Sequence, residues 1–248
     1  MATETTKVTA NYKGGPKFVT ETKGIWKLVE TALQHLRVVM VCGLPGVGKT
    51  FTAQEADANC ITVNMSEDTM VQELFCTWKV TKDGMELHDG PVMIAFREGR
   101  LLVINELSRA SGAVKDALLG ALDSRDSATV TLPDGETVRV NKGFRCVITS
   151  NESADELDPA LRDRCEAVID VSEPHPALIA ALNQAWANLG DVVNDSYSDP
   201  DRRISTRASF AYAKLRTAGV DKKMAITLAY GAKRAKDIET VFSLREVK

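Results

Sequence analysis

The chain has 248 residues, of which 44% are apolar and 26% charged, a composition typical of a globular protein with a sizeable buried core. Its formal net charge of −3 argues against a uniformly basic nucleic-acid binder. The longest apolar runs are too short to cross a bilayer, and five scattered cysteines without a Cys-x-x-Cys pair argue against a metal site or a disulfide framework.

The order of elements predicts an α/β fold. Residues 1–20 lack periodicity and are expected to form an irregular arm, and residues 24–36 have apolar positions at helical spacing. Strands are then expected at 37–42, 60–64, 101–105, 144–150 and 167–171, alternating with helices at 49–58, 67–76, 91–98, 111–122 and 159–164. Strands that are apolar on both faces and separated by helices predict a parallel sheet flanked by helices.

Two segments, 77–89 and 128–140, interrupt the alternation. Each places an Asp-Gly pair between β-rich flanks, which predicts a hairpin inserted into the α/β core. After Pro174 the pattern becomes helical, with helices expected at 176–187, 205–217 and 221–235. We therefore expect three parts: the arm (1–20), an αβα core (21–173) and a small all-α C-terminal domain (174–248).

The motif G-x-x-x-x-G-K-[ST] follows the first core strand directly and precedes a helix. Its residues are Gly43, Leu44, Pro45, Gly46, Val47, Gly48, Lys49 and Thr50, with Phe51 next in the chain. Glycines let the backbone wrap around phosphate, and the helix N-terminus adds partial positive charge. Lys49 is expected to bind the β and γ phosphates, and the Thr50 hydroxyl to bind magnesium. The motif predicts ATP and Mg²⁺ as ligands. We therefore expect 21–173 to be a nucleotide-binding core and 174–248 to be its lid.

A second strand, Leu101–Asn105, ends immediately before an acid, Glu106. A carboxylate at that strand end is placed to polarise the water that attacks a bound phosphate; the alternative is an ordinary exposed acid. An aspartate that supports magnesium usually precedes this acid, but this chain has Asn105. Asparagine keeps an oxygen and loses the charge, so Asn105 is expected to support the metal indirectly and hydrolysis to be weakened.

The sequence GPVMIAFREG at 90–99, followed by LLVINELSRA and KDALLGALDSR, resembles the MoxR branch of the AAA+ ATPases, which also includes dynein-related proteins. The resemblance runs from Val38 to the C-terminus and is most specific at 43–50 and 90–125. It implies a ring of identical subunits, expected to be a hexamer, that remodels a protein partner such as a von Willebrand A-type protein. Ser108 stands where the family usually has asparagine.

The resemblance also implies roles for individual residues. Asn64 would couple ligand state to the catalytic glutamate, or cap a helix instead. Asn151 would hold the attacking water or the γ-phosphate, or be a turn residue. Arg164, with Arg162 in reserve, would reach the nucleotide of the neighbouring subunit, and Arg207 would touch the γ-phosphate from the lid; either could be a solvated surface arginine.

In related proteins, insertions at the hairpin positions face the pore of the ring. Trp78, Met85 and Leu132 would then be the apolar side chains that contact the substrate, although a tryptophan on a hairpin is also explained by packing.

Three functions follow from these observations: a cytoplasmic ATPase motor, a nucleotide-gated binding module with weak or no hydrolysis, and a nucleic-acid-linked accessory protein. Asn105 motivates the second. The third is favoured by 12 basic against 5 acidic residues over 200–248, but disfavoured by the acidic chain as a whole.

Overall fold

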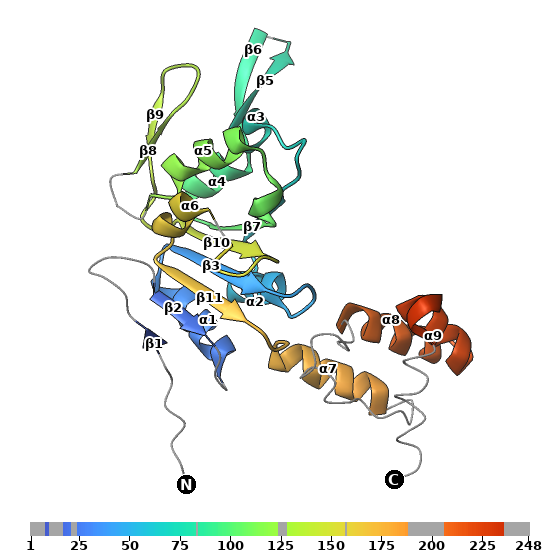
Figure 1. Cartoon of the computed structure of the whole chain (residues 1–248). Helices are drawn as coiled ribbons and strands as arrows, with labels where there is room; N and C mark the ends of the chain where they lie inside the picture. The colour runs from blue at the N-terminus through green and yellow to red at the C-terminus, as the bar shows by residue number, and fades with distance from the viewer. Residues whose placement is uncertain are drawn as a thin grey trace. The chain divides into compact units, whose positions relative to one another are not determined.

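The structure is a computed structural model, and it describes residues 8–9, 17–20, 24–82, 84–123, 128–156, 158–187 and 206–235 (Figure 1). The chain divides into two compact units. Unit 1 comprises residues 1–44 and 49–172, and unit 2 comprises residues 45–48 and 173–248. Unit 1 holds the sheets and most of the helices, whereas the elements of unit 2 are helical.

Unit 1 is built on a seven-stranded sheet with the order β1-β2-β11-β3-β10-β7-β4. The bounds are β1 Val8–Thr9, β2 Lys17–Thr20, β3 Val38–Gly43, β4 Ile61–Asn64, β7 Leu101–Asn105, β10 Arg145–Ser150 and β11 Ala167–Val171. All neighbouring strands are parallel except β1, which is antiparallel to β2. The predicted α/β class with a parallel sheet is therefore confirmed.

The N-terminal segment differs from the irregular arm expected over residues 1–20. β2 pairs in parallel with β11, and β1 adds a short antiparallel partner at the edge. A strand of two to four residues leaves little periodic signal in the sequence, so the sequence pattern did not reveal it.

Helices flank the sheet of unit 1. Their bounds are α1 Ile25–His35, α2 Lys49–Ala56, α3 Val71–Leu74, α4 Pro91–Glu98, α5 Gly112–Ala121 and α6 Pro159–Arg164, with a 3₁₀ turn, η1, at Leu107–Arg109. The helix expected at 67–76 is shorter than predicted. The backbone N–H of Ser66 donates to the Thr69 hydroxyl (2.9 Å) and forms a local turn. This turn competes with helix formation, so α3 begins only at Val71.

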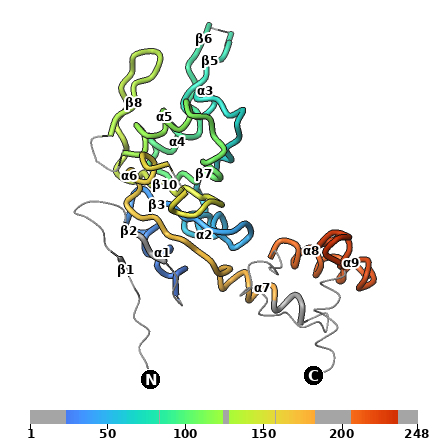
Figure 2. Tube along the Cα trace, viewed as in Figure 1, coloured from blue at the N-terminus to red at the C-terminus, as the bar shows by residue number. Residues whose placement is uncertain are grey.

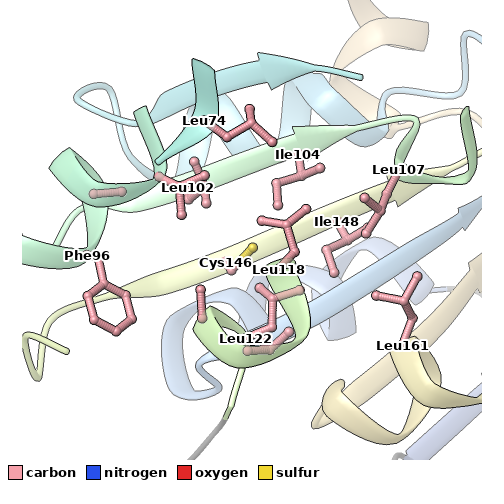
Figure 3. Packing of buried hydrophobic residues seen from close by; sticks show 14 of the residues in the cluster. Leu74, Phe96, Leu102, Ile104, Leu107, Leu118, Leu122, Cys146, Ile148 and Leu161 are labelled. Atoms are coloured by element: carbon pink, nitrogen blue, oxygen red, sulfur yellow. The ribbon is translucent and has the colours of Figure 1, made fainter. Parts of the chain in front are cut away.

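The largest apolar cluster packs helices against one face of the sheet, as Figure 3 shows. Leu102 and Ile104 alternate along β7, and Cys146 and Ile148 do so along β10, so all four point to the same face, where α5 contributes Leu118. Because both strands are buried along their length, the residues at their carboxyl ends are held firmly at one edge of the sheet.

Both predicted hairpins are present, and they project from the same end of unit 1 (Figures 1 and 2). β5 Cys76–Thr81 pairs with β6 Gly84–Asp89, and β8 Thr129–Thr131 pairs with β9 Thr137–Arg139. The register of β5 and β6 sets Trp78 opposite Leu87 and Val80 opposite Met85. One face of this hairpin is therefore apolar.

Unit 2 contains α7 Pro176–Ala187, α8 Thr206–Thr217 and α9 Lys222–Tyr230. Its small core includes Leu182, Tyr212 and Ile226, one residue from each helix. The helix expected to run to residue 235 is interrupted at Gly231, whose φ of 85° is incompatible with a continuing right-handed helix. Among the described helices of the chain, none is both long and apolar enough to cross a bilayer.

Candidate nucleotide-binding site

The phosphate loop leaves β3 at Gly43 and ends where α2 begins at Lys49. Gly43 has a φ of 137°, and a Cβ atom there would lie 2.1 Å from the backbone oxygen of Val171 on β11. Only glycine fits this close approach. A loop that leads directly into a helix N-terminus, as this one does, is the kind of segment whose backbone N–H groups can bind an anion.

Lys49 is buried, with an exposed fraction of 8%, and its ammonium group donates three hydrogen bonds. Nζ donates to the carbonyl oxygens of Gly43 (2.7 Å) and Leu44 (2.9 Å) and to Oδ1 of Asn151 (3.0 Å). Burial lowers the pKa of Lys49 from 10.5 to about 8, although the negative charge of Glu106 opposes this shift. A polyphosphate would supply the negative charge that this buried cation lacks.

Asn105, at the end of β7, is hydrogen-bonded on three sides. Its Oδ1 accepts from the hydroxyls of Thr50 (2.8 Å) and Thr149 (3.0 Å), and its Nδ2 donates to Oδ1 of Asn64 (2.9 Å). The strand register explains this network, because Asn105 pairs directly with Thr149 on β10 and with Asn64 on β4. The amide thus joins the phosphate loop to two neighbouring strand ends.

Glu106 occupies a left-handed conformation, with a φ of 57°, and is the one non-glycine residue with positive φ in the part of the chain that the structure describes. Its carboxylate accepts from Nδ2 of Asn151 (3.2 Å) and forms an ion pair with Nε of Arg109 (2.6 Å). Its backbone N–H donates to the Thr149 carbonyl (2.9 Å), which ties the bend to β10. Strained backbone of this kind is often found at functional positions.

The structure brings together six residues that the sequence singled out for the site in unit 1: Lys49, Thr50, Asn64, Asn105, Glu106 and Asn151. Asn64 does not cap a helix, since α3 begins at Val71 with Met70 as its N-cap. The side chain of Asn151 bridges Lys49 and Glu106, so it is more than a turn residue.

Two residues of the site were missed in the sequence. Thr149 lies two positions before Asn151, and Arg109 lies three positions after Glu106. Alternation along β10 could have indicated Thr149, because residues two positions apart in an extended chain lie on the same face and Asn151 is two positions further on. The spacing of Arg109 from Glu106 is the spacing of a helical ion pair, and η1 supplies that geometry.

The two candidate arginines of α6 lie apart from this cluster of hydrogen bonds. Arg164 is partly exposed and its Nη1 lies 3.7 Å from Oδ2 of Asp123, a long ion pair. Nη2 of Arg162 donates to the Asp155 carbonyl (3.1 Å). Which arginine reaches a neighbouring subunit stays a prediction.

The outer turn of the phosphate loop, Pro45–Gly48, belongs to unit 2. There the Val47 carbonyl accepts from the backbone N–H of His175 (2.7 Å), and the Gly46 carbonyl accepts from the Thr206 hydroxyl. Arg207 follows Thr206 at the start of α8 and is exposed. Its role as a γ-phosphate ligand stays a prediction, as do the roles of Leu44, which is exposed, and of the half-buried Phe51.

The candidate substrate contacts on the hairpins divide into two groups. Trp78 and Met85 are 45% and 63% exposed, as a contact residue requires. Leu132 is only 5% exposed and packs in the main apolar cluster, so its assignment as an exposed contact was wrong. One face of the β8–β9 hairpin packs on the core, which turns Leu132 inward together with Val138.

The described part of the chain has no cluster of acidic or soft metal ligands, and a cavity in it is lined by residues outside the site. Among the described residues, no group of three or more His, Cys, Asp or Glu side chains could hold a metal ion. A cavity of about 330 Å³ lies beside α5 and α6, lined by residues that include Ile148, Glu152 and Leu161. It contains none of the predicted site residues, so the hydrogen-bonded cluster at the sheet edge remains the better candidate.

Known proteins are similar to this chain in sequence over part of its length. An uncharacterized protein of Staphylococcus haemolyticus is 33% identical over 123 residues, which is 46% of this chain and 46% of that protein. Midasin of Dictyostelium discoideum is 30% identical over 128 residues, 48% of this chain but 2% of midasin. The chain thus spans less than half the length of these relatives.

Solved structures agree on the fold. NtrX from Brucella abortus superposes with a TM-score of 0.55 at 19% identity, over 80% of this chain and 51% of that one. A candidate ATPase from Cytophaga hutchinsonii gives a TM-score of 0.50, also at 19% identity, over 66% of this chain and 50% of its own. At this identity the likeness supports the fold alone.

The family model for the AAA domain of the dynein-related subfamily matches residues 38–165, just over half of the chain. The match begins at β3 and ends after α6, so it includes the phosphate loop and all four strand ends that form the hydrogen-bonded cluster. The chain therefore belongs to the dynein-related subfamily of AAA domains.

Proposed function

We propose that this protein is a magnesium-dependent ATPase that assembles into a ring, expected to be a hexamer, and remodels a protein partner. The observation that carries the proposal is the position of Asn151 between Lys49 and Glu106. One amide contacts both the cation that would bind the terminal phosphates and the acid that would polarise water. The phosphorus atom and its attacking water would therefore meet between these two groups.

Each side chain then has a defined task. Lys49 would exchange its carbonyl partners for β- and γ-phosphate oxygens, and Asn151 would hold the attacking water or the γ-phosphate. Glu106 would accept a hydrogen bond from that water and increase its nucleophilicity. The left-handed bend at Glu106 supports this role, because it turns the carboxylate out of the strand at the sheet edge.

The residues present fit a magnesium ion. Oxygen ligands are those that Mg²⁺ prefers, and the Thr50 hydroxyl and Asn105 Oδ1 lie 2.8 Å apart beside the loop. Thr50 would bind the ion directly and Asn105 through a water molecule. When bound, the ion would neutralise charge on the phosphate oxygens.

The ring and the partner rest on other features. Arg164 forms a long, partly exposed ion pair with Asp123, which it could exchange for a phosphate of the neighbouring subunit. The exposed Trp78 and Met85 give one hairpin an apolar face suited to a polypeptide. The similarity to midasin over the AAA domain is consistent with work on a protein partner.

A second candidate is a nucleotide-gated binding module with little hydrolysis. Its support is Asn105, a neutral residue whose amide is already used by Thr50, Thr149 and Asn64. Without a carboxylate, magnesium would be held less tightly and the transition state less stabilised. The protein would then bind ATP tightly and turn it over slowly.

Steady-state turnover of Mg·ATP tests the proposal. We expect the rate per subunit to rise with protein concentration until the ring is assembled, and Glu106→Gln to lower turnover by about 10²–10⁴-fold while ATP still binds. Glu67→Gln removes an exposed acid outside the cluster and serves as the matched control. A rate per subunit that stays constant through assembly would contradict a site completed by a neighbour.

Binding measurements separate the two candidates. Tight ATP binding without turnover in the wild-type protein would favour the gated module. If Lys49→Ala binds ATP as tightly as the wild type, both candidates fail. Capture of a protein by Glu106→Gln in ATP, but not in ADP, would support the remodelling role.

A further inference from the structure

One arginine, Arg97, contacts both of the hairpins that project from the same end of unit 1 (Figure 1). Arg97 lies in the last turn of α4. Its Nε is 2.7 Å from Oδ2 of Asp89, the final residue of β6. Its Nη1 and Nη2 donate to the two carboxylate oxygens of Glu136, at 2.7 and 2.5 Å, in the turn between β8 and β9. One guanidinium therefore binds both hairpins.

The geometry of this contact requires arginine. A planar guanidinium presents donors on two edges. Here Nη1 and Nη2 form a bidentate pair with Glu136, while Nε forms a close ion pair with Asp89 that lacks hydrogen-bond geometry. The hydrogen bonds from Arg97 hold the pKa of Glu136 below its usual value. A lysine ammonium could satisfy one of the carboxylates fully, but it could not reproduce the two-sided fork.

The backbone reinforces the contact between α4 and the second hairpin. Nδ2 of Asn141 donates to the Arg97 carbonyl (3.0 Å), and its backbone N–H donates to the Phe96 carbonyl (3.0 Å). A Cβ atom at Gly99 would lie 2.5 Å from Oδ1 of Asn141. The C-terminal end of α4 therefore packs closely against the segment that follows β9.

The chain connects each hairpin to one strand of the hydrogen-bonded cluster. β6 continues through Gly90 into α4 and then β7, which ends at Asn105 and Glu106. β9 continues through a short turn into β10, which carries Thr149 and leads to Asn151. Each hairpin is therefore followed in the chain by a different one of the two strands on which the proposed hydrolysis depends.

From these contacts we propose that Arg97 is a positioning residue that couples the two hairpins to each other. A displacement of either hairpin then reaches both β7 and β10. The hairpin coupling stands on the contacts alone, whereas its effect on turnover rests on the proposed function. Without the shared arginine, each hairpin would act only on the strand that follows it.

Amide hydrogen exchange of the full chain tests the coupling without nucleotide. In Glu136→Gln, whose change lies in the β8–β9 turn, we expect exchange over 76–89 to accelerate about two- to fivefold. Asp89→Asn should accelerate exchange over 128–140 by a similar factor. Arg97→Gln should do both, and Glu136→Gln should add nothing further in the Arg97→Gln background. Arg97→Lys should protect one hairpin better than the other.

The control is Arg139→Gln, which removes an exposed charge from β9 but not a partner of Arg97, and should leave exchange over 76–89 unchanged. The proposal is overturned if Glu136→Gln and Asp89→Asn each affect only their own hairpin, with thermal melting showing that both variants are folded.

Turnover provides the second arm. Arg97→Gln should change kcat for ATP by about threefold or more while KM stays within about twofold, because the residue touches no phosphate ligand. If kcat is unchanged although each hairpin variant accelerates exchange in the other hairpin, the effect on β7 and β10 is overturned, whereas the coupling of the hairpins stands. Absence of turnover in the wild-type protein would contradict the proposed function, and the exchange experiment would still decide the coupling.

Discussion

The amide nitrogen of Asn105 donates a hydrogen bond to Oδ1 of Asn64, 2.9 Å away on the neighbouring strand. The same amide accepts from Thr50 and Thr149 through its oxygen, so it acts as a donor on one side and an acceptor on the other. A carboxylate in this place could accept but not donate at neutral pH. The asparagine therefore closes a network that an aspartate would leave open unless Asn64 rotated its own amide.

Asn105→Asp is expected to increase the affinity for magnesium. The new negative charge lies beside the Thr50 hydroxyl, so the half-saturating Mg²⁺ concentration for ATP turnover should fall by about 3–10-fold. Magnesium titrations of wild type and variant measure this. Asn105→Ala, which removes the network without adding charge, is the control and should lose turnover. Equal magnesium dependence in Asn105→Asp and wild type would show that residue 105 does not act near the metal.

Lys49 predicts a specific dependence of stability on pH. Its pKa is lowered from 10.5 to about 8 by burial, so between these values the unfolded state binds more protons than the folded state. The free energy of unfolding should therefore rise from about pH 8 to 10.5, on the order of 1–3 kcal/mol. Urea unfolding of wild type and Lys49→Met across this range isolates the effect. Parallel curves for the two proteins would refute it.

The arginine of the neighbouring subunit can be identified by mixing two inactive proteins. Lys49→Ala keeps Arg164 but loses its own phosphate contact, and Arg164→Ala keeps the phosphate loop. If Arg164 acts on the next subunit, mixed rings should recover part of the turnover that each variant lacks alone, since one interface in the mixture is complete. Lys49→Ala mixed with Arg162→Ala tests the reserve candidate. If mixed rings of confirmed composition do not recover activity, the arginine acts within its own subunit.

Gly43→Ala should destabilise the protein. Its Cβ atom would lie 2.1 Å from the Val171 backbone oxygen, and the pairing of these two residues between β3 and β11 prevents a local shift. We expect a loss of about 2–4 kcal/mol in chemical unfolding. Gly120→Ala, on the exposed side of α5 with open space around it, should instead gain about 0.5–1 kcal/mol. A neutral Gly43→Ala would mean that the loop can move away from β11.

The sequence could predict the strand ends because the phosphate loop fixes one of them. Once Lys49 follows a strand in a parallel sheet, other polar residues at strand ends, such as Asn105 and Asn151, must share its edge. The sequence could not predict which hydrogen bonds they form, since these depend on register: Asn105 meets Thr149 and Asn64 only because those residues are its direct strand partners.

The hairpins mark a second limit. Their Asp-Gly turns were sufficient to predict them, but the direction of Leu132 was not predicted, because a short hairpin over a core has one face that alternation alone does not identify. The pairing of Arg97 with two hairpins was also invisible. Its partners lie 8 and 39 positions away, and nothing local marks them as neighbours.

The three neutral oxygen atoms that accept hydrogen bonds from Lys49 compete with the phosphate oxygens of a nucleotide, and this competition affects which nucleotides bind. A phosphate that displaces the Gly43 and Leu44 carbonyls must return at least as much hydrogen bonding as it removes, or the exchange is unfavourable. A single terminal phosphate offers few oxygens within reach, whereas a triphosphate chain presents oxygens of two groups at once. Discrimination against nucleoside monophosphates would then arise from this competition among acceptors, with no dedicated steric barrier required.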